Sequence, residues 1–422
     1  MMIKPAKRVA TQRQDVWSFV NEAAAKAPIQ PIINMGQGFF GYNPPDFVIK
    51  AAKSVFDHVH CNQYAPTKGR PTLKAAIARS YAPSFGRVIN PETEVVVTTG
   101  ANEGMLSAFF AFLEPGHEVI VFEPFFDQYI SNIQMPGAKV VVVKLHAPPT
   151  AAKHTVSSAE WTVNFEELKQ AISKNTKMVV LNTPHNPLGK VFSTKELEQI
   201  GQICVENNLI LLSDEVYDHL LYVDSIRPAA LHREIAERTL TVGSAGKMFY
   251  ATGWRVGLLI GPADLIKHVS AAHTRICYSS VSPLQEAVAL SLNQADTNGF
   301  FEEAVSDMLG KIKRFTAVFD ELSIPYTRPE GGYFVVANLK KVQFPDNYSF
   351  PPHVAARPRD FRLSYFLMNE VGVAAVPPSD FYLNEDAHLI EECLRFSVCK
   401  TDEDLEEAKR RLRGLSQYIR AQ

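Results

Sequence analysis

The 422-residue sequence has few cysteines, no long apolar run and almost no net charge. Its five cysteines are widely spaced without a C-x-x-C pair, which argues for reduced thiols in a cytosol-like compartment and against a disulfide framework. No stretch of about eighteen uncharged apolar residues occurs, so the sequence predicts no membrane span. A net charge of -2 gives no reason to expect nucleic acid or an anionic membrane as a partner.

Basic residues precede the first acidic residue near the N-terminus. Lys4, Lys7, Arg8 and Arg13 all come before Asp15, and a weak mitochondrial transit peptide has this character. Little length is left, however, before the first residues with a predicted function. We therefore predict a cytoplasmic protein and keep mitochondrial targeting as the alternative.

Apolar strands alternate with helices through the middle of the chain. The predicted strands cover residues 95–97, 119–121, 139–145, 177–181, 209–212, 239–242 and 256–260. Continuous apolar strands separated by helices are typical of a mainly parallel sheet that is covered on both faces. The sequence therefore predicts an α/β fold with a mainly parallel seven-stranded sheet, in which ligands bind at the carboxyl ends of the strands.

The pattern changes beyond about residue 285. Two helical stretches precede a mixed region that ends in a charged amphipathic helix from Thr401, and this predicts a smaller α+β domain. A proline-containing N-terminal stretch is expected to be an extended arm that joins it. The expected division is an arm over 1–45, a large domain over 46–300 and a small domain over 301–422.

The predicted strand 239–242 runs into the small residues Gly243-Ser244-Ala245-Gly246 and then Lys247. Small residues let the backbone approach a ligand closely. A desolvated lysine at this position is suited to forming a Schiff base with a carbonyl group. The alternative is a plain strand-to-loop turn with a solvated lysine.

Two further features suggest that a phosphate binds near Lys247. Ala101 and Asn102 follow Gly100 at the start of a helix, where free amides and the helix dipole attract anions. Ser244 and Arg255 add a hydroxyl donor and a cation. Glycine turns before helices are common, so the helix start alone does not establish a phosphate site.

Asp214 follows an apolar strand, where a carboxylate is costly unless it has a partner. A cationic pyridine nitrogen would be such a partner, although capping a helix is the alternative. Tyr217 and Asn186 are placed to hydrogen-bond a ring hydroxyl, and Phe126 offers a face for stacking. With the lysine and the phosphate features, this set predicts pyridoxal 5′-phosphate as the cofactor.

The sequence predicts no metal site. His58, His60 and Cys61 lie close together, but helical positions two apart point to different sides and no second pair of ligands follows.

The ordered motifs resemble the fold-type I pyridoxal-phosphate aminotransferases of class I/II. Within that family the sequence is most similar to the branch of kynurenine aminotransferase, glutamine transaminase K and cysteine-conjugate β-lyase. The residues that carry this resemblance are 34–39, 62–64, 123–127, 181–192, 213–217, 243–247, 251–254 and 394–396.

The resemblance implies a role for each cofactor-binding residue. Lys247, Asp214 and Tyr217 would be catalytic, with Lys247 bonded to the cofactor and later moving the substrate's Cα proton. The implied cofactor-binding set is Ala101, Asn102, Phe126, Asn182, Asn186, Asp214, Tyr217, Ser244, Lys247, Arg255 and Tyr64. Tyr64 would reach the phosphate of a neighbouring subunit, which implies a homodimer with shared active sites.

The resemblance also implies a substrate site. Arg395 would clamp the α-carboxylate with help from Asn186 and the Gly38 backbone. Trp17, Phe126 and Tyr278, the last from the partner subunit, would form an aromatic pocket. Asn102 and Tyr278 stand where relatives often have Tyr and Phe respectively.

The resulting hypothesis is a ping-pong aminotransferase that moves an amino group from an aromatic amino acid, above all kynurenine, to a 2-oxo acid. The product of kynurenine would be kynurenate, and β-elimination of cysteine conjugates would be a side activity. The enzymatic alternative is an aspartate or broad aromatic aminotransferase. A pyridoxal-phosphate-binding regulator is the alternative outside enzymes, although no basic helix-turn-helix is visible.

Overall fold

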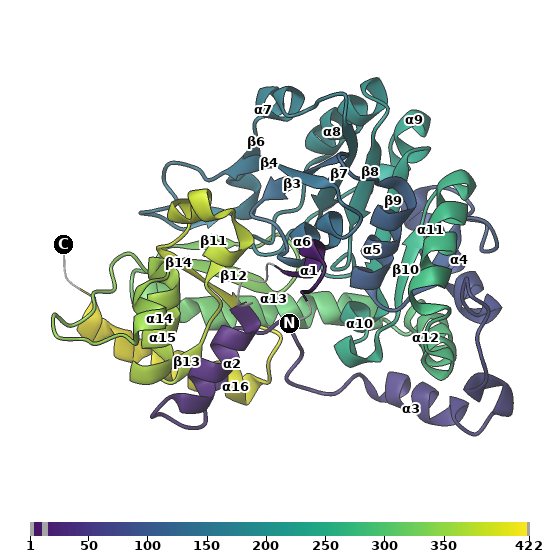
Figure 1. Ribbon diagram of the computed structural model, residues 1–422. Coiled ribbons are helices and arrows are strands. Elements are labelled where there is room, and N and C mark those ends of the chain that lie inside the picture. The colour runs from purple at the N-terminus through teal and green to yellow at the C-terminus, as the bar shows by residue number, and fades with distance from the viewer. Residues whose placement is uncertain (1–3, 11–15, 420–422) are drawn as a thin grey trace.

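A computed structural model describes residues 4–10 and 16–419 (Figure 1). Its largest sheet has eight strands in the order β2-β10-β9-β8-β7-β3-β4-β6. These strands are β2 (Val95–Thr98), β3 (Glu118–Glu123), β4 (Lys139–His146), β6 (Thr162–Val163), β7 (Thr176–Asn182), β8 (Ile210–Asp214), β9 (Thr239–Ser244) and β10 (Gly257–Ile260). All seven predicted strands are present, and β6 is a short addition at one edge.

The sheet is mainly parallel, as predicted. Strands β4, β3, β7, β8 and β9 run parallel to one another, whereas β10 is antiparallel to both β9 and β2. The short β6 is antiparallel to β4. The α/β fold class predicted from the alternation of strands and helices is therefore confirmed.

Helices cover both faces of this sheet because its strands are apolar on both sides. Alternate residues of β2 show this: Val96 packs into one core and Val95 and Val97 into another. The helices on the Val96 side are α5 (Ala101–Phe112), α6 (Gln128–Gln134) and α11 (Ala263–Cys277). The opposite side packs against α4 (Pro71–Phe85), α8 (Thr194–Glu206) and α12 (Ser282–Ala295).

The C-terminal third of the chain builds a second, smaller sheet in the order β14-β12-β11-β5. Its strands are β5 (Val156–Ser157), β11 (Tyr326–Arg328), β12 (Phe334–Asn338) and β14 (Cys393–Ser397). The helices of this region are α13 (Phe300–Glu321), α14 (Pro352–Ala355), α15 (Arg359–Glu370) and α16 (Asp402–Leu412). Because β5 comes from the middle of the chain, this sheet is not built from one continuous segment.

The N-terminal arm is not extended throughout, which corrects the sequence prediction. Residues Val16–Lys26 form helix α2, whose Phe19 packs edge-on against Phe361 of α15. Strand β1 (Ile33–Asn34) then pairs in parallel with β13 (Val373–Ala374). The prolines mark the flanks of the helix, and burial of its apolar face explains why it forms. The boundaries 1–45, 46–300 and 301–422 stay a prediction.

The remaining helices are α1 (Lys7–Ala10), α3 (Asp46–Val55), α7 (Phe165–Gln170), α9 (Arg233–Ala236) and α10 (Ala245–Met248). Across residues 4–10 and 16–419, none of the helices combines the length and the apolar character needed to cross a membrane.

The register of the large sheet brings the predicted site residues together. Asn182 of β7 pairs with Asp214 of β8, and Asp214 pairs with Val242 of β9. The carboxyl ends of these three strands therefore meet at one edge of the sheet, and Lys247 follows β9 on α10.

Candidate active site

A cavity of about 190 Å³ lies at the carboxyl ends of β7, β8 and β9. It is lined by Ala101, Asn102, Met105, Phe126, Asn182, Asn186, Asp214, Val216, Tyr217, Ser244, Lys247 and Arg255. Every predicted cofactor-binding residue except Tyr64 is in this lining. Met105 and Val216 also line the cavity and were not predicted from the sequence.

Asp214 supplies a buried carboxylate to the cavity. Its Oδ2 accepts a hydrogen bond from the Tyr129 hydroxyl at 2.5 Å, and its Oδ1 lies 3.4 Å from the Val216 amide. Burial raises the pKa of Asp214 to about 6. Within the part of the chain that the structure describes, this carboxylate forms no salt bridge, so a cationic ring nitrogen in the cavity would give it the partner it lacks.

Asn182 holds the end of β7 in place. Its side-chain amide donates to the backbone carbonyl of Asp214 at 2.9 Å, and its side-chain oxygen accepts from the Asn186 amide at 2.7 Å. Asn182 therefore fixes the turn that carries Asn186 into the cavity.

The start of α5 forms an anion-binding cradle. Gly100 caps this helix in a left-handed conformation (φ +82°) without a side-chain hydrogen bond, and Ala101 and Asn102 face the cavity. The Arg255 guanidinium lies so close that a Cβ on Gly100 would meet its Nη2 at 2.4 Å. Ser244 Oγ accepts from the Lys247 amide, which leaves its own hydrogen to donate. These groups fit a phosphate.

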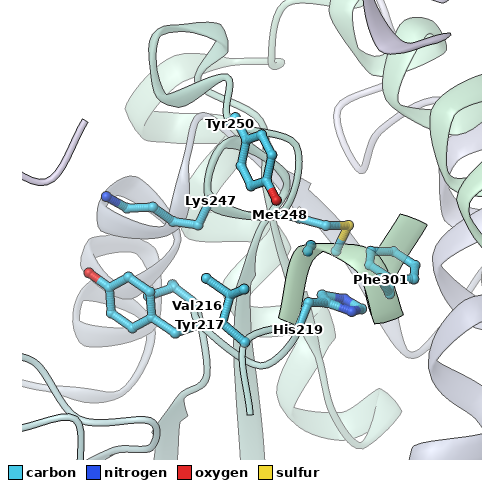
Figure 2. A pocket seen from close by; sticks show the side chains of 9 residues that line it. Val216, Tyr217, His219, Lys247, Met248, Tyr250 and Phe301 are labelled. Carbon is cyan, nitrogen blue, oxygen red and sulfur yellow. The ribbon is translucent and has the colours of Figure 1, made fainter. Parts of the chain in front are cut away.

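Lys247 reaches the cavity with a partly desolvated amine. Its Nζ lies 3.0 Å from the Tyr333 hydroxyl and 3.2 Å from the Gly38 carbonyl oxygen. Burial lowers the pKa of Lys247 to about 8. Figure 2 shows the Lys247 amino group and the Tyr217 hydroxyl extending to the same side, opposite Phe301.

Arg395 lies buried behind the cavity. Its guanidinium donates to Asn186 Oδ1 at 3.1 Å and to the Gly36 carbonyl at 2.7 Å. Burial lowers the pKa of Arg395 to about 10. Its Nε has no hydrogen-bond partner among the described residues. A buried cation with an unused donor fits a substrate carboxylate.

The backbone of residues 36–39 is held by side chains from the other end of the chain. We call this segment the carbonyl loop, since each of its four carbonyl oxygens accepts a side-chain hydrogen bond. Lys400 Nζ donates to the carbonyls of Gln37 and Phe39 at 2.9 and 2.7 Å, and the Tyr333 hydroxyl donates to Gly38 at 2.9 Å. Arg395 donates to the Gly36 carbonyl, and Lys247 also donates to the Gly38 carbonyl.

The structure places Trp17 beside Arg395 and leaves two predicted tyrosines outside the cavity. The Arg395 guanidinium lies 5.4 Å from the Trp17 ring, and the Trp17 indole N–H lies 3.4 Å from Asp127 Oδ2. Tyr64 and Tyr278 are 85% and 56% exposed, with ring centroids 5.7 Å apart. They are not brought to the cavity of their own chain.

Tyr129, Tyr333 and Lys400 were not predicted from the sequence. Tyr129 lies two residues beyond the 123–127 motif, so its proximity was a usable signal. Tyr333 and Lys400 touch the carbonyl loop across about three hundred residues, and no local pattern indicates such contacts.

A family model described as aminotransferase class I and II matches residues 30–412. The chain belongs to the class I and II aminotransferases. It is 49% identical to the Saccharomyces cerevisiae protein named "Probable kynurenine--oxoglutarate transaminase BNA3", over 96% of this chain and 93% of that one. The crystal structure of yeast Bna3p superposes with a TM-score of 0.96 at 48% identity, covering 99% of this chain and all of that one.

More distant relatives do not all carry the same substrate name. A Dictyostelium discoideum protein named kynurenine--oxoglutarate transaminase is 33% identical, over 96% of this chain and 95% of that one. A Mycobacterium tuberculosis protein named "Probable N-succinyldiaminopimelate aminotransferase DapC" is 36% identical, over 94% and 95% of the two chains. Membership of the family therefore establishes an aminotransferase and leaves its substrate to be argued from the site.

Pyridoxal 5′-phosphate is the cofactor of this aminotransferase. The cavity fits it, because the buried Asp214 carboxylate at the end of β8 has no salt bridge among the described residues, and the start of α5, which has no side-chain cap, lines the same cavity as Ser244 and Arg255. Lys247 lies in the same lining with an amine whose pKa burial has lowered.

The phosphate cradle depends on Gly257. A Cβ at this position would meet the backbone of Gly100 at 2.4 Å and of Ala101 at 2.6 Å, and no side-chain rotation relieves that overlap. We expect Gly257→Ala to raise the dissociation constant of pyridoxal phosphate about tenfold or more, as overpacking costs ~1–3 kcal/mol. Equilibrium dialysis measures this. Gly253→Ala is the matched control, because nothing lies within 4 Å of its added Cβ. Equal cofactor affinity in the two variants would contradict the claim that the backbone at Gly100 and Ala101 binds the phosphate.

Lys400 is expected to support substrate binding through the carbonyl loop. In Lys400→Met the carbonyls of Gln37 and Phe39 lose their charged donor, at a cost of ~1.5–3 kcal/mol for such bonds. We expect KM for the amino acid to rise about tenfold or more, with a smaller change in kcat and with cofactor absorbance retained. Steady-state kinetics test this against exposed Lys340→Met as the control. An unchanged KM would show that Lys400 does not support substrate binding.

The lowered pKa of Lys247 predicts how cofactor loading depends on pH. Only the neutral amine can bond to the cofactor aldehyde, so loading of cofactor-free protein should speed up as pH rises towards about 8 and level off above it. Stopped-flow absorbance between about pH 6 and pH 10 measures the rate. A midpoint near the ordinary lysine value of 10.5 would show that burial does not tune this amine.

Proposed function

We propose that this aminotransferase moves an amino group from kynurenine or a related aromatic amino acid to a 2-oxo acid. The observation that carries the proposal is the position of Trp17 beside the buried Arg395 guanidinium. Arg395 suits the α-carboxylate that every amino acid and 2-oxo acid has. Trp17 and Phe126 then offer aromatic surface to the substrate side chain.

The chain's own residues divide the work of the reaction. Asn186 orients the Arg395 guanidinium, which would hold the substrate carboxylate. Lys247 would take the proton from the substrate's α-carbon, and its lowered pKa suits that transfer near neutral pH. When bound, pyridoxal phosphate supplies an electron-withdrawing ring that stabilises charge at that carbon. Asp214 would keep the ring nitrogen protonated, and Tyr217 would donate to the ring oxygen.

A ping-pong sequence follows from having one substrate site. The amino acid and the 2-oxo acid each carry a carboxylate next to the reacting carbon, so both would use Arg395 in turn. β-Elimination of cysteine conjugates would begin with the same removal of the α-proton and is proposed as a side activity.

An aspartate aminotransferase would need a second cation for the distal carboxylate. In the cavity lining the cations are Lys247 and Arg255, and both are assigned to the cofactor. This favours an aromatic substrate over aspartate. The yeast and Dictyostelium relatives named kynurenine--oxoglutarate transaminases add support for kynurenine.

We also propose a homodimer with shared active sites. The two tyrosines outside the cavity contact each other, and further large apolar side chains near them in the sequence are exposed as well: Phe56, Val59, Ile276 and Val281. Burying such side chains against a second copy would lower the free energy. Tyr64 would then reach the partner's phosphate and Tyr278 its substrate pocket.

The five free cysteines support a reducing compartment, and we propose the cytoplasm.

Single-turnover absorbance with a panel of amino acids tests the proposed substrate. Kynurenine and phenylalanine should convert the bound cofactor faster than aspartate, and Lys247→Ala should show no conversion. Trp17→Ala should weaken kynurenine binding about tenfold or more, since losing contact with one aromatic side chain costs ~1.5–3 kcal/mol. Alanine, which has no side chain to reach Trp17, is the matched control substrate. Fastest conversion with aspartate would overturn the aromatic proposal and leave the aminotransferase intact.

A further inference from the structure

Three side chains with metal-binding atoms converge outside the cavity. They are Glu103 in the first turn of α5 and His273 and Cys277 near the end of α11, two helices that pack side by side (Figure 1). Their ligand atoms all lie within 4.8 Å of one another. Glu103 and His273 are 170 residues apart in the chain, so the sequence analysis had no means of seeing this group.

The distances within this group are close to those around a zinc ion. His273 Nδ1 lies 3.0 Å from both carboxylate oxygens of Glu103 and 3.4 Å from Cys277 Sγ. Zinc bonds of about 2.0–2.3 Å in a tetrahedron place neighbouring ligand atoms ~3.3–3.7 Å apart. The Glu103 and Cys277 ligand atoms lie no more than 4.8 Å apart, so an ion would draw these two side chains together by up to about 1 Å.

The helical spacing presents two of the ligands together. His273 and Cys277 are four residues apart on α11 and so lie on the same face of that helix. The His273 side chain is fully buried, whereas the Glu103 side chain is 13% exposed and Cys277 is partly exposed. In the single chain the Glu103 and Cys277 side of the group is therefore less buried than the His273 side.

The charges of the group also suit a divalent cation. Hydrogen bonds from His273 and Ser107 outweigh burial and lower the pKa of Glu103, so this carboxylate is ionised. Cys277 would lose its thiol proton on binding, and the carboxylate and thiolate together would balance a charge of two.

We propose that Glu103, His273 and Cys277 form a binding site for one zinc ion per chain. A sulfur ligand with an imidazole favours zinc over magnesium or calcium. Three protein ligands leave the fourth position to water, which is the arrangement of an exchangeable site. The Thr99 hydroxyl, 3.4 Å from Cys277 Sγ, lies beside the group.

The fold does not require the ion. Glu103 and His273 are already in hydrogen-bond contact at 3.0 Å, and Glu103 also accepts from the Thr99 amide at 2.9 Å. Zinc would displace the proton that lies between Glu103 and His273, and it would also bind Cys277. The site is independent of the proposed substrate, because none of its three ligands lines the cofactor cavity.

Cobalt(II) titration of the metal-free holoenzyme tests the proposal. Tetrahedral cobalt with a thiolate ligand absorbs in the visible region beyond the cofactor bands, and one equivalent per chain should saturate the signal. Zinc should displace the cobalt. Cys277→Ser should weaken cobalt binding more than about tenfold, since even residues that only support a metal ligand cost 10–100-fold when changed. Unchanged cofactor absorbance in this variant would show that it is folded.

A second thiol–imidazole pair provides the matched control. Cys61 Sγ lies 3.4 Å from His60 Nε2, but no carboxylate joins them in a metal-binding group of the described residues. Cys61→Ser should therefore keep the cobalt signal. The proposal is overturned if the signal is absent, or if cobalt affinity in Cys277→Ser equals that of the unaltered protein.

Alkylation of the unaltered holoenzyme gives a second readout that needs no variant. Zinc should slow the reaction of Cys277 with a maleimide several-fold, as peptide mapping by mass spectrometry would show. An equal rate with and without zinc would contradict the site even if Cys277→Ser failed to fold.

Discussion

The active site depends on keeping two opposite charges, Asp214 and Lys247, buried at the ends of adjacent parallel strands. The sheet register sets their separation, because Asp214 pairs with Val242 and Lys247 follows five residues later. Burial raises the pKa of the carboxyl group and lowers that of the amine, so each becomes easier to pair or to bond with a ligand in the cavity. In the proposed mechanism, the carboxylate would pair with the cofactor's ring nitrogen and the amine would bond to its aldehyde.

The carbonyl loop couples the N-terminal arm to these charges. Arg395 and Lys400, both from the C-terminal part of the chain, donate to the backbone of residues that follow β1. The same Arg395 is the proposed carboxylate ligand, so substrate binding and the position of the arm share one guanidinium. Tyr333 joins the loop to Lys247 through hydrogen bonds at both Gly38 and Nζ. An arm that looks peripheral in the sequence is therefore hydrogen-bonded to both Lys247 and Arg395.

The sequence predicted the large sheet and most of the cofactor cavity because both depend on local patterns. Continuous apolar runs mark β3, β7 and β8, and the polar residues that line the cavity come directly after such runs. Helix α2 was missed because the prolines around it suggested an extended arm, whereas its packing against Phe361 stabilises a helix. Lys400 and the Glu103–His273–Cys277 group depend on contacts between distant segments, and neither has a local signature.

The central claim is that Lys247 is the residue that bonds to pyridoxal phosphate in this cavity. Borohydride reduction of the holoenzyme would make that bond permanent, and peptide mass spectrometry would locate it. We predict one pyridoxyl group per chain, on the peptide that contains Lys247, and none in Lys247→Ala. A pyridoxyl group on any other lysine would contradict the roles assigned to Lys247 and Asp214 in this cavity.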